Sequence, residues 1–84
     1  MIKEYICGWE PDKAPNDNRH VYTFSPRAED AYHWEYRYLA EVFCVDLNRG
    51  VRVPSDGTYL CTDFQIEEHA PGRFLIYCKA PFGA

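Results

Sequence analysis

The chain of 84 residues lacks any long hydrophobic run, and no segment approaches the ~20 apolar residues that a bilayer-spanning helix requires. The N-terminal residues Met1-Ile2-Lys3-Glu4 contain no apolar signal core. We therefore expect a cytoplasmic protein that does not bind membranes. Internal repeats, low-complexity tracts and linkers are also absent, so residues 1–84 are expected to form a single domain.

Cysteines with the spacing of metal ligands are absent too. The chain has no CxxC or CxH pair. Each cysteine lies in an apolar segment, and thiols in the cytosol are normally kept reduced. We expect four buried, reduced thiols that behave as small hydrophobic side chains, with no metal and no cofactor. The four are Cys7, Cys44, Cys61 and Cys78.

Positive charge is scarce, because nine lysines and arginines face 13 acidic residues and the net charge is −4. Duplex nucleic acid and anionic membranes are bound by clustered basic residues, so neither is an expected partner. The acidic residues are spread evenly, with no run longer than Glu67-Glu68, which makes a poor imitation of a phosphate backbone.

No catalytic motif is evident. A cysteine nucleophile would need His20, His33 or His69 within hydrogen-bond reach, and nothing local brings such a pair together. Glu67, Glu68 and His69 could act as acids, bases or ligands, but they precede a predicted hairpin turn, where solvated polar residues are usual. We therefore expect neither an enzyme nor a metal site.

What the sequence does contain is a helix signal between Ser25 and Arg49, which allows two interpretations. In the long one, Ser25 is the N-cap, Pro26 occupies the first helical position, and the helix runs to about Asn48. That helix would place Glu35 within its apolar face, where an unpaired carboxylate is costly.

The short interpretation avoids this cost, and we favour it. Residues 25–31 then form one capped turn, residues 32–34 are extended, and the main helix runs from about Glu35 to a stop at Gly50. Glu35 moves to the N-terminus, where a carboxylate is favourable. The predicted core-facing row is Tyr36, Ala40, Phe43, Cys44 and Leu47, with Leu39 at its edge.

The remaining segments read as strands and turns. Alternation in the first strand predicts Tyr5, Cys7 and Trp9 on one face and Ile6 and Gly8 on the other. The loop Glu10–Arg19 is longer than usual, and a functional role for it stays open. The second strand is expected to pair antiparallel with the first. The predicted strands are Ile2–Trp9, His20–Phe24, Val51–Val53, Thr58–Glu68 and Arg73–Ala80.

The last two strands are predicted to form a hairpin with a defined register. Placing Ile66 opposite Ile76 also places Phe64 opposite Cys78, so that one face is apolar throughout. The three-residue loop Ala70-Pro71-Gly72 would close the hairpin. The outer face of the longer strand is expected to carry Tyr59, Cys61, Asp63, Gln65 and Glu67.

These elements predict an α+β fold, with one main α-helix packed on a small antiparallel β-sheet in the order β-β-α-β-β-β. Element order alone says little about function. The most informative feature is a second apolar row on the predicted helix, formed by Tyr38, Val42 and Val45 opposite the core-facing row. A monomeric helix rarely exposes such a row, although in the long interpretation it would belong to the core.

The expected function is therefore that of a non-enzymatic protein-interaction module, which binds either a protein partner or a second copy of itself in a homodimer. The alternative is single-stranded nucleic-acid binding, in which exposed rings stack on bases and arginines hold phosphates. The residues predicted for that alternative face are Tyr5, Trp9, Arg19, Tyr22, Arg52 and Tyr59.

Overall fold

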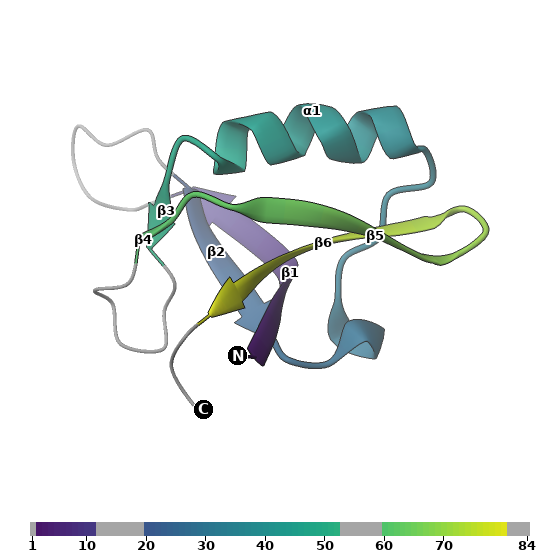
Figure 1. The fold of residues 1–84 in the computed structure, drawn as a ribbon, viewed down its shortest axis with the longest axis horizontal. Helices are drawn as coiled ribbons and strands as arrows, with labels where there is room; N and C mark the ends of the chain where they lie inside the picture. The colour runs from purple at the N-terminus through teal and green to yellow at the C-terminus, as the bar shows by residue number, and fades with distance from the viewer. Residues whose placement is uncertain (1, 12–19, 53–59, 81–84) are drawn as a thin grey trace.

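The computed structural model describes residues 2–11, 20–52 and 60–80 (Figure 1). One helix lies across an antiparallel sheet of strand order β2-β1-β6-β5, and β3 and β4 form a separate pair. The predicted α+β class is confirmed. The elements are β1 (Ile2–Pro11), β2 (His20–Ser25), the 3₁₀ helix η1 (Ala28–Asp30), α1 (Arg37–Leu47), β3 (Val51–Arg52), β4 (Leu60–Cys61), β5 (Phe64–Ala70) and β6 (Arg73–Ala80).

The short interpretation of the central stretch is confirmed, because α1 starts at Arg37 and is separated from the turn at η1. The predicted cap of that turn differs, because the N-cap of η1 is Arg27 and makes no side-chain cap hydrogen bond. The Ser25 hydroxyl instead accepts a hydrogen bond from the backbone N–H of Arg27 (3.2 Å) before the turn begins. The helix ends where predicted. Gly50 has a φ of 120°, a conformation that glycine adopts without strain, and its N–H bonds to the Leu47 carbonyl (3.0 Å).

The inner face of α1 packs over β5 and β6. Ala40, Cys44 and Leu47 are buried there, and Phe43 is partly buried against the same core. The prediction that Tyr36 belongs to this row is wrong. Tyr36 is the N-cap, with an extended backbone (φ −121°, ψ 137°), so it lies outside the helical periodicity and its side chain is exposed.

Strands β1 and β2 pair antiparallel as predicted, but β1 is irregular at Cys7. Ile6 pairs with Phe24 and Gly8 with Thr23, so Cys7 is an extra residue that forms a β-bulge. The bulge reverses the alternation: Ile6 and Trp9 pack on the helix side, whereas Tyr5 is buried on the far side of the sheet. The predicted shared face of Tyr5, Cys7 and Trp9 is therefore wrong.

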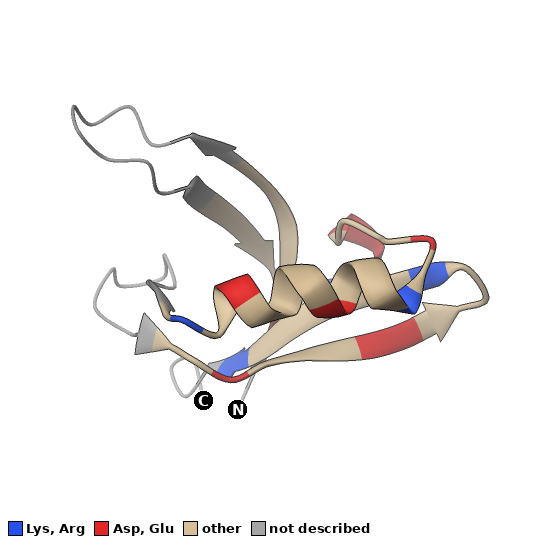
Figure 2. Ribbon diagram, turned by 90° about the horizontal axis from the view of Figure 1, so that it is seen from above, with Lys and Arg blue, Asp and Glu red and all other residues tan. Residues whose placement is uncertain are grey.

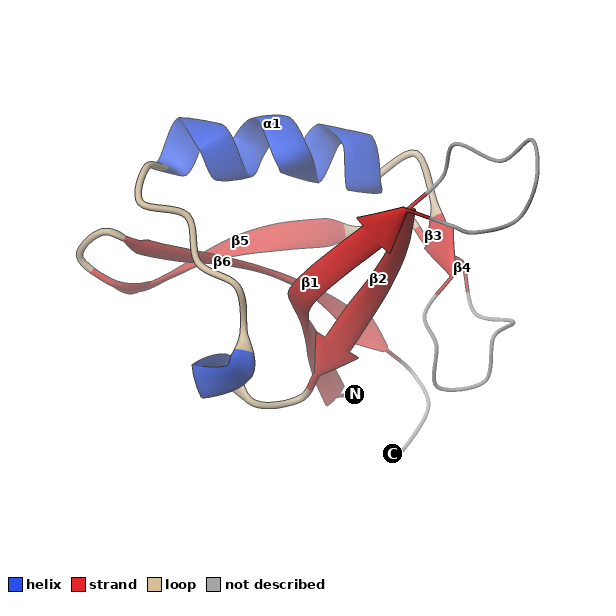
Figure 3. Ribbon diagram, turned by 180° about the vertical axis from the view of Figure 1, so that it is seen from behind, coloured by secondary structure: helices blue, strands red, loops and turns tan. Residues whose placement is uncertain are grey.

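Beyond the bulge, the segment between η1 and α1 takes over the contact with β6 (Figure 3). Only residues 2–5 of β1 pair with β6. Tyr32 donates its N–H to the Ile6 carbonyl (2.9 Å), and Trp34 exchanges two backbone hydrogen bonds of 2.9 Å with Phe74. This segment is extended, as predicted, and it links the β1–β2 hairpin to the β5–β6 hairpin.

The predicted register of the β5–β6 hairpin is confirmed: Phe64 lies opposite Cys78 and Ile66 opposite Ile76. Its turn differs from the prediction. Ala70 pairs with Arg73, so the turn contains two residues, and His69 is accommodated as a bulge. Pro71 followed by Gly72 at φ 73° is the residue pair typical of a type II turn.

The stretch predicted as one long strand is divided into β4 and β5 by Thr62 and Asp63. The alternation restarts at this break, so Cys61 is buried in the helix-side core and its predicted outward position is wrong. Thr58 and Tyr59 lie outside the described residues. Cys44, Cys61 and Cys78 are buried as expected, but Cys7 is only partly buried.

The first residue of β5 is held by the end of α1. The Phe64 N–H donates to Asn48 Oδ1 (2.6 Å), and Asn48 Nδ2 donates to the Phe64 carbonyl (3.3 Å). The Cys44 thiol donates to the same carbonyl (3.2 Å). An edge strand leaves a row of backbone groups unpaired, and here the Asn48 side chain bonds to the first of them. These contacts fix the distance between α1 and the sheet.

Candidate interaction surface

The outer face of α1 carries a continuous row of exposed apolar side chains. Tyr38 is 61% exposed, Val42 66% and Val45 64%. On a helical wheel these three residues lie within about 60° of one another, because successive residues turn by about 100°. We call them the outer row. The structure thus places the predicted residues together on a free face of the described chain, and their role as an interface stays a prediction.

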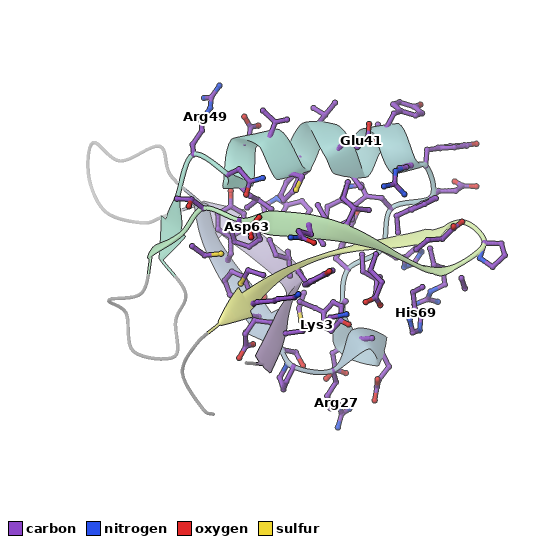
Figure 4. The ribbon with its side chains drawn as sticks, in the orientation of Figure 1. Lys3, Arg27, Glu41, Arg49, Asp63 and His69 are labelled. Carbon is purple, nitrogen blue, oxygen red and sulfur yellow. The ribbon has the colours of Figure 1, made fainter. Side chains whose placement is uncertain are left out.

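Two further side chains extend this surface beyond the outer row. Leu39 is exposed on one side of the helix, and Tyr36 lies at its start. The rings of Tyr36 and Tyr38 are stacked, with their centroids 5.8 Å apart. Figure 4 shows that α1 carries side chains on the side that faces away from the sheet. From Tyr38 to Val45 the outer row extends about 10 Å along the helix, at about 1.5 Å per residue.

Charged residues accompany the outer row along α1, and Figure 2 marks the acidic residues red and the basic ones blue on the ribbon. Arg37 Nε lies 3.2 Å from Glu41 Oε1 along one side of the helix. Near the C-terminal end, Arg49 Nε lies 4.0 Å from Asp46 Oδ1. Both pairs are largely exposed, and exposed pairs of this kind contribute little to stability. The result is an apolar strip with a polar rim, which is the usual anatomy of a protein interface.

The alternative nucleic-acid face is not assembled in the described part of the chain. Trp9 and Tyr22 both pack against Phe43 beneath α1, with ring centroids 4.6 and 6.2 Å from that of Phe43. Tyr5 lies on the opposite side of the sheet, so these rings do not form one stacking platform. Arg19 and Tyr59 lie outside the described residues, as does the side chain of Arg52.

The far side of the sheet holds a polar network that sequence analysis missed. Glu67 Oε1 accepts hydrogen bonds from Lys3 Nζ (3.0 Å) and the Tyr5 hydroxyl (3.1 Å). Its other oxygen lies 3.7 Å from His69 Nδ1, and Lys3 Nζ stands 4.5 Å from the centre of the Tyr77 ring. Lys3 and Tyr5 are more than sixty residues from Glu67, so no local pattern could have revealed the cluster.

The electrostatics of this network oppose acid–base catalysis. Burial alone would raise the pKa of Glu67, but the hydrogen bonds from Lys3 and Tyr5 outweigh it and leave that pKa below its ordinary value. Burial raises the pKa of Tyr5, and the carboxylate of Glu67 raises it further. A general acid or base works best with a pKa near the ambient pH, and these shifts move both groups away from neutrality.

Two of the buried thiols, those of Cys44 and Cys78, are also poor nucleophiles. Burial raises the pKa of Cys78 to about 12, with Cys61 beside it adding to the shift. Burial likewise raises the pKa of Cys44. The reactive form of cysteine is the thiolate, and a raised pKa keeps the thiol protonated at neutral pH. These cysteines therefore act as core side chains.

Within residues 2–11, 20–52 and 60–80, no group of three or more His, Cys, Asp or Glu side chains could hold a metal ion. The helices in these same ranges include none long and apolar enough to cross a membrane. Comparisons of the chain with protein-family models, curated proteins and solved structures gave no match. The outer row and its rim are therefore the basis for assigning a function.

Proposed function

We propose that this protein is a non-enzymatic protein-interaction module whose occupant on the outer row is a second copy of the chain. The observation that carries the proposal is the exposure of Tyr38, Val42 and Val45 on a helix whose opposite face is fully used by the core. A two-fold pair is the simplest use of a single apolar patch, because one surface then serves both copies.

Energetics support a weak, reversible association. Fully burying one large apolar side chain contributes about 1.5–3 kcal/mol, so the outer row offers several kcal/mol per copy. Much of this is offset by the lost freedom of two molecules, which costs an estimated ~4–15 kcal/mol. The balance favours a pair that forms at micromolar or higher concentrations.

The free edge of β5 is a less favourable route to self-association. The backbone groups of Phe64, its first residue, already bond to Asn48. Antiparallel pairing of two β5 strands about Glu67 would set the two Glu67 carboxylates directly opposite each other, and like charges in that position are destabilising. Pairing through the outer row of α1 would not oppose like charges in this way, because the row itself is apolar.

The test is Val42→Asp, measured by sedimentation velocity and light scattering over a concentration series. A charge at the centre of the outer row should abolish the pair, because an unpaired carboxylate is costly in an apolar contact. Circular dichroism should show a native fold, since Val42 is exposed. The matched control is Thr62→Asp, which adds the same charge at an exposed position between β4 and β5.

Self-association of Val42→Asp at the wild-type level would remove the outer row from the interface. A wild-type chain that remains monomeric at every concentration would overturn the self-association itself. Loss of association in Thr62→Asp as well would show that net charge, rather than the outer row, controls it.

A further inference from the structure

We infer that the two copies pair with their α1 helices antiparallel, so that Arg49 of each copy meets Glu35 of the other. This inference rests on the proposed self-association through the outer row. It adds the orientation of the pair and the residues that select it. Shape, charge and contact area each bear on the orientation.

Shape favours the antiparallel arrangement. Val42 lies between Tyr38 and Val45 in the outer row, so a two-fold axis perpendicular to the helix near Val42 places Tyr38 of one copy beside Val45 of the other. A large ring then faces a small side chain, which is how packed layers interdigitate. Parallel helices would instead oppose Tyr38 to Tyr38 and Val45 to Val45, crowding one end and leaving space at the other.

Charge favours the same arrangement. Glu35 precedes the N-cap Tyr36, and Arg49 follows the C-cap Asn48, so opposite charges stand at the two ends of α1. Figure 4 shows Arg49 extending beyond the end of the helix. Its side chain is 80% exposed, and its contact with Asp46 is long at 4.0 Å. Antiparallel pairing matches Arg49 with Glu35 at both ends, and parallel pairing opposes like charges.

The helix dipoles also favour the antiparallel arrangement. The N-terminus of a helix carries a partial positive charge and the C-terminus a partial negative one. Antiparallel neighbours bring these opposite ends together, whereas parallel neighbours align like ends. The effect is modest and screened by salt, as are contacts between exposed ionised side chains.

The area of the surface explains why a few charges should matter. Burying the exposed parts of Tyr36, Tyr38, Leu39, Val42 and Val45 in both copies removes on the order of 1,000 Å² from water, near the lower limit for specific interfaces. An interface of that size has little surplus affinity. The charges at its rim can therefore select one orientation over the other.

The experiment is a charge exchange measured by sedimentation equilibrium on the full chain. Arg49→Glu and Glu35→Arg should each weaken the pair about tenfold, because each replaces two exposed attractions with two repulsions by symmetry. The double variant Glu35→Arg/Arg49→Glu should recover wild-type affinity. An equimolar mixture of the two single variants should also associate at the wild-type level.

Two controls isolate the ionic contacts from other effects. Glu68→Arg changes the charge as Glu35→Arg does, but on β5 at an exposed position, and it should leave the affinity unchanged. At about 1 M salt the Debye length falls to about 3 Å, so the differences among the variants should largely disappear.

The outcomes separate this inference from the proposed function. A wild-type pair with unaffected single variants, or a double variant as weak as the single ones, overturns the antiparallel arrangement and leaves self-association standing. A wild-type chain that is monomeric at the highest soluble concentration overturns the proposed function, and the pairing with it.

Discussion

The two faces of α1 carry similar numbers of apolar residues but have different structural roles. The inner face uses Ala40 and Cys44, whose small side chains let the helix approach the sheet closely enough for Cys44 to bond to the Phe64 carbonyl at 3.2 Å. The outer face carries Tyr38, Val42 and Val45, all of which remain exposed. The comparison teaches that two apolar rows with the same helical spacing can differ in role, because contact with the sheet covers one of them and leaves the other exposed.

The largest expected difference between the faces is in folding stability. Leu47→Ala should lower the free energy of unfolding by about 2–5 kcal/mol, because Leu47 is fully buried and its removal leaves a cavity. Val45→Ala on the outer face should change it by no more than about 0.5 kcal/mol. Urea unfolding followed by circular dichroism, at concentrations where the chain is monomeric, measures both. Equal costs at the two positions would mean that the outer face is also buried in the monomer.

A smaller effect is expected where the inner side of α1 is joined to β5. Asn48→Ala removes both hydrogen bonds to Phe64 and leaves its N–H unpaired, which should cost about 1–3 kcal/mol. Hydrogen exchange at the Phe64 amide should speed up more than exchange elsewhere in β5. Asp46→Ala, at an exposed position on the same helix, is the control and should alter neither quantity. An unchanged Phe64 exchange rate would show that Asn48 does not hold this strand.

The smallest effect on stability is expected for the polar network around Glu67, which lies on the side of the sheet opposite α1. The pKa of Glu67 is lowered in the folded state, so its contribution is present above the unfolded pKa of about 4.3 and is lost as the pH falls through the folded value. Unfolding free energies at neutral pH and near pH 3 should therefore differ less in Glu67→Gln than in the wild type.

The control for this pH dependence is Glu68→Gln. Glu68 is exposed, and among the described residues no ion pair involves its carboxylate. This variant should keep the wild-type loss of stability on acidification. If both variants showed the same reduced loss, the network around Glu67 would not be the source of the effect.

Sequence patterns correctly predicted the strand register of one hairpin and the position of the helix, although not the turn that closes the hairpin. The β5–β6 register followed from alternation on both strands, because a shift of one residue would have turned Phe64 and Ile76 away from the core. The start of α1 near Glu35 followed from the cost of a carboxylate in an apolar face. The positions of Tyr38, Val42 and Val45 then followed from helical geometry alone.

Local patterns failed where a distant contact changed the backbone. A single inserted residue at Cys7 reversed the facing of Trp9, and the break at Thr62 turned Cys61 into the core. Nothing nearby in the sequence distinguishes a strand with a bulge from one without it. The prediction for Tyr36 was wrong for another reason: α1 begins at Arg37 rather than near Glu35, which leaves Tyr36 as an extended N-cap outside the helical periodicity.

The amino-acid sequence by itself determined the order of the helix and the strands and the spacing of apolar residues along them, but not the division of one predicted strand into β4 and β5. The favoured short interpretation predicted the row of α1 that is covered, except for Tyr36, but both rows satisfy the same periodicity and the long interpretation placed the outer row in the core. Only the tertiary structure decided between the two, because Ala40, Cys44 and Leu47 are buried against the sheet while Val42 and Val45 stay exposed. It likewise decided the partners of Glu67, because β1 and β5 come together only when β6 lies between them.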